Sequence, residues 1–308
     1  MVLYYGVIMK KYLKPFLACA ILAGTIGAFT YYLIKHPQTV GHIKNMPPLT
    51  LVLLLVLYFG WFIAYALVTR GLLHIYHKHM GVQENFLFNA YSNLINFFGP
   101  GQSGPIFRGA YLKKKYNLGI KPYMFTLLLY YAFYGVISVM FMFIGTAPWW
   151  LTAGLIVGAA GGSFIILRWY RNKNRAKLGT NQPHLTASNM AWVFEATALQ
   201  LAIQAVIYGV ELHNVGAHAS LSQVLAYTGV ANMALFVALT PGAIGVREAF
   251  LAFSQQLHHI NTSTIVAANV VDRAAYIVFL GVLFVLVISL HARDKLSIKS
   301  LDLSRKKS

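Results

Sequence analysis

Long apolar runs constrain this chain more than any other feature of its sequence. An α-helix needs about 20 apolar residues to cross the hydrocarbon of a bilayer, and runs of that order occur at residues 15–34, 49–69, 123–145, 149–168, 189–210 and 264–290. Only 10% of the 308 residues are charged, whereas soluble domains carry roughly a quarter. The sequence therefore predicts an all-α, polytopic membrane protein, with six spanning helices in one membrane domain over residues 1–308.

The distribution of basic residues predicts how these helices are oriented. If the N-terminus is cytoplasmic, nearly all of the 25 lysines and arginines fall in segments on the cytoplasmic side, as the positive-inside rule describes. We therefore expect a protein of the cytoplasmic membrane with both termini inside and a basic tail at 291–308. Topology then explains the formal net charge of +18, so we expect membrane lipids and no nucleic acid as partners.

Two segments, 84–112 and 221–257, combine apolar sequence with helix breakers. Each contains the pattern P-G-x-x-G, formed by Pro100, Gly101 and Gly104 in the first and by Pro241, Gly242 and Gly245 in the second. Proline removes an amide donor and glycine weakens a helix, so both helices should break there. Because lysines and arginines flank only the first segment, we expect two re-entrant hairpins that enter the membrane from opposite sides.

The repeated hairpins predict an inverted repeat. The first repeat would cover residues 15–145 and the second 149–290. Broken backbone at membrane depth is tolerated only where protein buries it or where it lines a wet cavity. Paired broken helices in inverted repeats often mark the substrate site of a transporter, so the hairpins are where we expect a substrate to bind.

Six charged residues in or beside apolar sequence are candidate substrate-binding residues, because intramembrane ionisable groups are functional candidates by default. They are Arg108, Glu195, Arg247, Glu248, Asp272 and Arg273. Two interpretations of Arg247 stay open. It forms a structural ion pair, for instance with Asp272 while Glu248 pairs with Arg273, or it binds a lipid phosphate, which a guanidinium matches in bidentate fashion. Glu195, Glu248 and Asp272 are also candidate proton carriers.

The second motif, PGAIGVREA at 241–249, is similar to the P-G-G-x-G-x-R-E-A signature of the lysylphosphatidylglycerol synthase transmembrane region, a flippase-like family. Residues 93–112 resemble that family's first motif, with Pro105 where members often carry an acidic residue. The resemblance covers nearly the whole chain. It implies that the protein moves or handles a lipid with a polar headgroup, such as an aminoacylated phospholipid or a polyprenyl-linked sugar.

Three classes of function remain open: a lipid transporter, a membrane-embedded aminoacyl or glycosyl transferase, and a non-catalytic partner of a separate synthase or glycosyltransferase. The inverted hairpins favour the transporter. Full-length synthases of the resembled family carry a soluble aminoacyl-transferase domain after the membrane region. Only residues 291–308 follow the last apolar run here, so we expect that domain to be absent and the chain not to be an enzyme. The sequence contains no P-loop and no acidic motif able to hold Mg²⁺, and we expect no metal and no cofactor.

Overall fold

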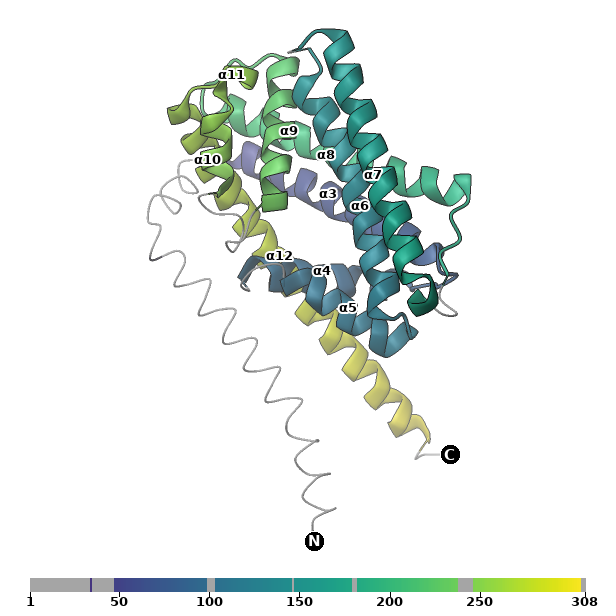
Figure 1. Ribbon diagram of the computed structural model, residues 1–308. Coiled ribbons are helices and arrows are strands. Elements are labelled where there is room, and N and C mark those ends of the chain that lie inside the picture. Colours follow the sequence, from purple (N-terminus) through teal and green to yellow (C-terminus); the bar gives the residue numbers. More distant parts are fainter. Residues whose placement is uncertain are drawn as a thin grey trace. The chain divides into compact units, whose positions relative to one another are not determined.

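The structure is a computed structural model that describes Ile34 and residues 47–98, 103–145, 147–178, 182–237 and 246–305. The chain divides into two units, Met1–Asn45 and Met46–Ser308, and the helices discussed below belong to the second. In the described part of the chain every regular element is an α-helix (Figure 1). The predicted all-α class is therefore confirmed.

Five of the described helices are long and apolar enough to cross a membrane, namely α3 (Pro48–His74), α6 (Ile120–Phe143), α7 (Trp149–Leu178), α8 (Ala187–Asn214) and α12 (Thr262–Arg305). Each coincides with one of the predicted spans from residue 49 onward. The remaining predicted span, 15–34, lies outside the described residues apart from Ile34. Helix α12 continues past the predicted end of its span at residue 290, through most of the basic tail.

Capping side chains explain where three of the helices begin. Thr186 accepts a hydrogen bond from the backbone N–H three residues on and starts α8. Ser220 and Gln223 form a reciprocal capping box at the start of α9 (Leu221–Val237), in which each side chain accepts from the other's backbone N–H. Asn261 caps α12 in the same manner as Thr186 caps α8. These polar residues satisfy amide donors that a helix start leaves without partners.

Shorter helices occupy the two segments that contain the P-G-x-x-G patterns. The first segment forms α4 (Val82–Phe98) and α5 (Ser103–Tyr116), and the second forms α9, α10 (Val246–Phe253) and α11 (Gln255–His258). The longest of them, with 17 residues, reaches about 26 Å at 1.5 Å per residue. The hydrocarbon layer is about 30 Å thick. Apart from Ser103 and Gly104, the residues of both patterns lie outside the described part of the chain.

Helices α4 and α5 pack closely against each other, and Gly104 is where they approach most tightly. A Cβ atom added to Gly104 would lie 2.7 Å from the backbone oxygen of Ser92 and 2.8 Å from the Cβ of Asn96. Ser103 donates a hydrogen bond to the backbone oxygen of Ile95 at 2.8 Å. Helix α5 therefore folds back along α4, and glycine is required at this contact because any side chain would displace the backbone of α4.

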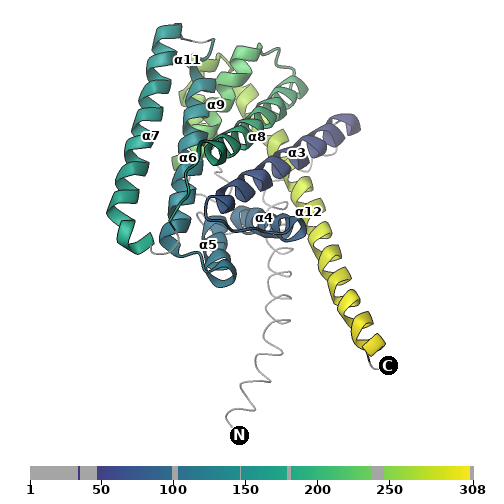
Figure 2. The ribbon, with the colours of Figure 1, turned by 90° about the vertical axis from the view of Figure 1, so that its right-hand side faces the viewer.

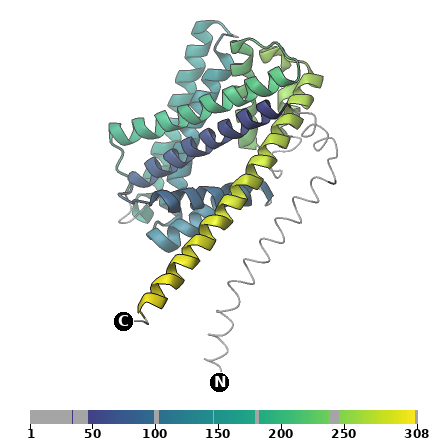
Figure 3. The same ribbon diagram turned by 180° about the vertical axis from the view of Figure 1, so that it is seen from behind.

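Helices α3 and α8 lie side by side (Figures 2 and 3), and both also contact α6 and α12. A Cβ at Gly71 of α3 would lie 2.5 Å from the indole of Trp192 on α8, which shows how tightly they pack. Helix α12 packs on α3, α8 and α4, while α6 packs on α8, α3 and α9. Helix α7 contacts α6 and is otherwise largely exposed.

Candidate functional site

Arg247 of α10 is buried and forms the centre of a polar network. Its Nη1 donates to the hydroxyl of Tyr208 at 3.2 Å, and its Nη2 donates to Asn269 and forms an ion pair with Asp272. The guanidinium also lies 5.7 Å from the centre of the Tyr208 ring. Its Nε is buried without a hydrogen-bond partner among the described residues. The arginine is thus neutralised, yet it keeps one donor unused.

Asp272 connects this network to a second buried carboxyl, that of Glu211. The hydroxyl of Tyr58 lies 2.7 Å from Oδ1 of Asp272 and 3.2 Å from Oε1 of Glu211. Glu211 is 1% exposed, and within the described ranges no lysine, arginine or histidine nitrogen lies within 4.0 Å of its carboxyl. Residues from α3, α8, α10 and α12 therefore meet in one cluster that holds two carboxyls and one closely bound guanidinium.

Arg108 of α5 forms a separate buried centre with different partners. Its Nε donates to Ser92 at 2.7 Å and its Nη2 donates to Asn89 at 2.9 Å. The guanidinium lies over the ring of Tyr65, 4.2 Å from the centroid. Arg108 is 6% exposed, and in the described part of the chain no carboxylate oxygen lies within 4.0 Å of it. Among the described residues, neutral dipoles and aromatic faces are the groups that stabilise this cation.

A row of tyrosines links the Arg108 centre to the second half of the chain. The ring of Tyr65 lies 5.8 Å from that of Tyr130, and Tyr130 lies 5.6 Å from Tyr134. The hydroxyl of Tyr134 donates to Asn232 of α9 at 2.9 Å. This row provides hydroxyl groups and π faces between the two hairpin segments.

Two asparagines in the short helices keep amide donors without partners. The Nδ2 atoms of Asn93 in α4 and Asn232 in α9 are buried and have no hydrogen-bond partner in the described residues. Both side chains are strongly buried, at 8% and 0% exposure respectively. A buried amide donor without a partner costs about 1 to 3 kcal/mol. Such groups are therefore candidates for contacts with a ligand or with water.

The sequence-based candidates divide into two groups in the structure. Arg247 and Asp272 come together, as one of the two sequence interpretations requires. Arg273, which directly follows Asp272 in the chain, is also buried. Arg108 is buried in its own centre, whereas Glu195 is exposed on α8. The side chain of Glu248 and residues Pro100, Gly101, Pro241, Gly242 and Gly245 lie outside the described part.

Sequence reasoning missed Glu211, Tyr58 and Asn269. Glu211 directly follows the predicted span 189–210, and α8 continues beyond it to Asn214, so this carboxyl is buried in the helix bundle. Its position at the end of an apolar run was the available signal. Asn269 precedes Asp272 by three residues and therefore lies on the same face of α12. Nothing in the sequence around Tyr58 distinguishes it from the other tyrosines.

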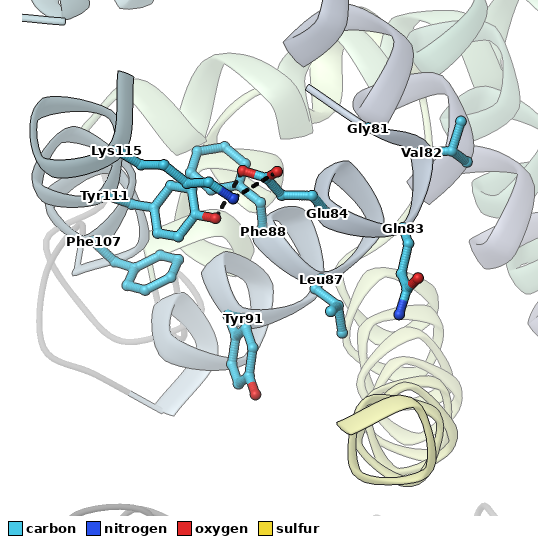
Figure 4. Close-up of a pocket in the computed structure, with 10 residues that line it drawn as sticks. All are labelled: Gly81, Val82, Gln83, Glu84, Leu87, Phe88, Tyr91, Phe107, Tyr111 and Lys115. Atoms are coloured by element: carbon cyan, nitrogen blue, oxygen red, sulfur yellow. Dashed lines mark hydrogen bonds and ion pairs between the residues drawn. The ribbon is translucent and has the colours of Figure 1, made fainter. Parts of the chain in front are cut away.

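A pocket of about 510 Å³ opens between the start of α4 and the end of α5 (Figure 4). Glu84 lies at its edge, where it accepts hydrogen bonds from Tyr111 at 2.8 Å and Tyr116 at 2.7 Å and pairs with Lys115 at 2.8 Å. Partial burial favours a higher pKa for Glu84, but the bonds from Lys115, Tyr116 and Tyr111 outweigh it, and the pKa of the carboxyl lies below its ordinary value. This cluster ties the two ends of the α4–α5 hairpin together.

Among the described residues, no group of three histidine, cysteine or acidic side chains could hold a metal ion.

The family model described as the Lysylphosphatidylglycerol synthase TM region matches residues 16–283 of the chain. No curated protein and no solved structure matches it significantly.

Proposed function

Since the chain belongs to the family of the lysylphosphatidylglycerol synthase TM region, we propose that it is a flippase-like transporter that moves a lipid with a polar headgroup across the cytoplasmic membrane. The family and the apolar helices establish a multi-pass membrane protein with a lipid-related function. The transport step and its lipid, an aminoacyl phospholipid or a polyprenyl-linked sugar, are our proposal.

The observation that carries this proposal is the environment of Arg108. A buried arginine needs an anionic partner or several well-placed dipoles, because burying a cation is costly. Ser92, Asn89 and the Tyr65 ring stabilise Arg108 without neutralising it. Among the residues described, no carboxylate lies within ion-pair distance of Arg108. The phosphate of a lipid headgroup would supply the missing negative charge in a geometry that a guanidinium matches well.

The helix contacts support an internal repeat that relates the two hairpins. When α3, α4, α5 and α6 are paired with α8, α9, α10 and α12, the contacts of the first set all recur in the second. For example, α4 packs on α5 as α9 packs on α10. The contacts between the two sets correspond as well, because α6 packs on α9 as α12 packs on α4. The hairpin arginines also correspond, because Arg108 lies over Tyr65 of α3 and Arg247 lies near Tyr208 of α8.

The lengths and charges of the short helices support opposite re-entry of the two hairpins. None of the helices α4, α5, α9, α10 and α11 meets the criteria for a membrane span, and α5 ends with Lys113, Lys114 and Lys115. The sequence from 211 to 246 contains no lysine or arginine. This asymmetry is expected if the first hairpin opens to the cytoplasm and the second to the outside.

In the proposed transport step the headgroup passes between the two arginines. Its phosphate would accept hydrogen bonds from Arg108 on one side and from Arg247 on the other. The unused amide donors of Asn93 and Asn232 would contact its polar oxygens in between. The row Tyr65, Tyr130 and Tyr134 would provide π faces for a cationic aminoacyl group.

The test is transbilayer movement of fluorescent lipids in liposomes that contain the purified protein. Labelled phosphatidylglycerol, lysylphosphatidylglycerol and phosphatidylcholine are compared by the fraction accessible to a membrane-impermeant quencher. Arg108→Gln should slow movement about tenfold or more, because a hydrogen bond to a charged group contributes about 1.5 to 3 kcal/mol. Arg70→Gln is the matched control, since Arg70 is an exposed arginine at the end of α3.

If the wild-type protein does not move any of the three lipids, the transport proposal fails. The alternative function is that of a membrane-embedded lipid aminoacyl or glycosyl transferase, or of a non-catalytic partner of one. Transfer of a labelled headgroup by the chain alone would indicate a transferase. Co-purification with a synthase whose activity depends on the chain would indicate a non-catalytic partner.

A further inference from the structure

Glu211 is a buried carboxyl that takes no part in the transport step proposed above. It lies in the last turn of α8, three residues before the end of that helix at Asn214. His213, two positions after Glu211, is exposed. Glu211 is therefore almost completely buried but only one helical turn from the end of α8.

The surroundings of Glu211 favour its neutral form. An ionised carboxylate that is buried without a bound cation has a large desolvation cost, and such a group takes up a proton instead. The hydroxyl of Tyr58 lies 3.2 Å from Oε1 of Glu211. Arg247 is already paired with Asp272, and among the described residues no cation lies within ion-pair distance of Glu211.

The groups that face Glu211 come from several helices. They are Tyr58 of α3, Asp272 of α12, Arg247 of α10, Tyr227 of α9 and Tyr208 of its own helix. Arg273 acts electrostatically on Asp272 and lies more than 4.0 Å from the Glu211 carboxyl. Helix α6, which also packs against α8, directs Tyr130 to Gln200 and Tyr134 to Asn232 instead. The hydroxyl of Tyr58 and the carboxyl of Asp272 itself thus link Glu211 to the ion pair.

The distances define a direction for the hydrogen bonds. Tyr58 has one hydroxyl proton, and the bond to Asp272 at 2.7 Å is shorter than the contact with Glu211 at 3.2 Å. A protonated Glu211 donates to the oxygen of Tyr58, and Tyr58 donates to the ionised Asp272. In this arrangement the hydroxyl of Tyr58 both accepts and donates, and of the two carboxyls the ionised one is Asp272, which Arg247 neutralises.

We propose that Glu211, Tyr58 and Asp272 form a proton-binding relay, which couples the uptake of one proton to the binding of an anionic lipid group at Arg247. The relay rests on the proposed transport function. An anion that takes over Arg247 leaves Asp272 without its counter-ion. Tyr58 then gives its proton to Asp272 and receives one from Glu211, and Glu211 is reprotonated by water at the end of α8. The bound anion and the added proton are together electrically neutral.

The resting protonation state can be measured without transport. Infrared difference spectroscopy compares the purified wild-type protein with Glu211→Gln at neutral pH. The wild type should show the carbonyl stretch of a protonated carboxyl, and Glu211→Gln should lack it. His213→Gln, which changes an exposed titratable residue two positions away on α8, should keep the band. If the wild type and Glu211→Gln have identical carboxyl bands, Glu211 is ionised and the relay is wrong.

Coupling is measured in the same liposomes with a pH difference across the bilayer. At one proton per lipid, each pH unit should shift the steady-state ratio of labelled phosphatidylglycerol between the leaflets by about tenfold. Glu211→Gln should abolish this shift, whereas His213→Gln should preserve it. A shift that survives in Glu211→Gln, or that is missing from an active wild type, overturns the coupling. Complete absence of lipid movement would instead overturn the transport function and with it the coupling, while the infrared band would still decide the protonation of Glu211.

Discussion

Arg247 and Asp272 form a buried ion pair that joins the short helix α10 to the long helix α12. Asn269 and Tyr208 also accept hydrogen bonds from the guanidinium, while Tyr58 binds the other oxygen of Asp272. The pair therefore holds the second hairpin segment against the helix bundle. It also keeps a cation in the buried interior of that bundle.

The first prediction separates a structural role of this ion pair from phosphate binding. Asp272→Asn alone should destabilise the protein by about 3 to 5 kcal/mol, because it leaves a buried guanidinium without a counter-ion. Arg247→Met combined with Asp272→Asn should recover most of the thermal stability, measured by melting in detergent. If Arg247 binds the lipid phosphate, this double variant stays inactive in lipid translocation.

Arg247→Lys complements that experiment. A lysine keeps the charge but cannot make the forked contacts with Asn269, Asp272 and Tyr208, so translocation should fall while the fold is retained. Full translocation by the double variant would show that the ion pair is only structural.

The second prediction concerns the aromatic partner of Arg108. Tyr65→Phe keeps the π face under the guanidinium and should leave lipid translocation within about twofold, since a cation–π contact is worth about 0.5 to 2 kcal/mol and is retained. Tyr65→Leu removes that face and should reduce translocation about threefold to tenfold at unchanged expression. Equal rates for the two variants would show that the ring does not stabilise the cation.

The third prediction tests the close contact within the α4–α5 hairpin. Gly104→Val should lower the melting temperature and the yield, because its Cβ would meet the backbone of Ser92 at 2.7 Å and overpacking costs about 1 to 3 kcal/mol. Gly158→Val is the control, since no atom lies within 4 Å of a Cβ added there. Similar losses in both variants would mean that the contact at Gly104 has no special importance.

The fourth prediction is a pH dependence of the cluster around Glu84. The pKa of Glu84 is lowered in the folded protein relative to its ordinary value of 4.5. The cluster therefore contributes stability above about pH 4.5 and loses it as the pH falls through the lower folded pKa. The contribution is at most about 1 kcal/mol because Lys115 is half exposed. The protection factors of the α5 amides, which correct hydrogen exchange for its intrinsic rate at each pH, should fall at acidic pH in the wild type.

Glu84→Gln removes the titrating group, so the protection factors of the α5 amides should then be low at neutral pH and change little on acidification. Lys113→Gln is the control, because Lys113 is an exposed lysine on the same helix. A wild type whose α5 amides have the same protection factors at neutral and acidic pH would contradict the role of Glu84 in closing the hairpin.

The fifth prediction concerns orientation in the membrane. In a Cys19→Ala background, Lys114→Cys should react with an impermeant thiol reagent from the cytoplasmic side, and His218→Cys should react from the outside. Both positions are exposed. Reaction of both from one side would rule out the inverted arrangement of the hairpins.

The five long apolar helices that the structure describes could be predicted from the sequence because they depend on local properties. An apolar run of about 20 residues is a helix in a bilayer whatever surrounds it, since its backbone groups have to be satisfied internally. The capping residues Thr186 and Asn261 act within three residues of their own positions. The charged motif at 241–249 was sufficient to identify the family that the whole-chain comparison supports.

Only the tertiary structure decided which polar groups meet. Tyr58 lies 153 positions from Glu211 and 214 from Asp272 in the chain, and no local pattern relates residues so far apart. The same holds for Arg108, whose partners Ser92 and Tyr65 come from two other helices. The rotation of each packed helix determines which side chains face its neighbours. The sequence thus determined which segments are apolar enough to cross a membrane, and packing determined which polar side chains are buried together.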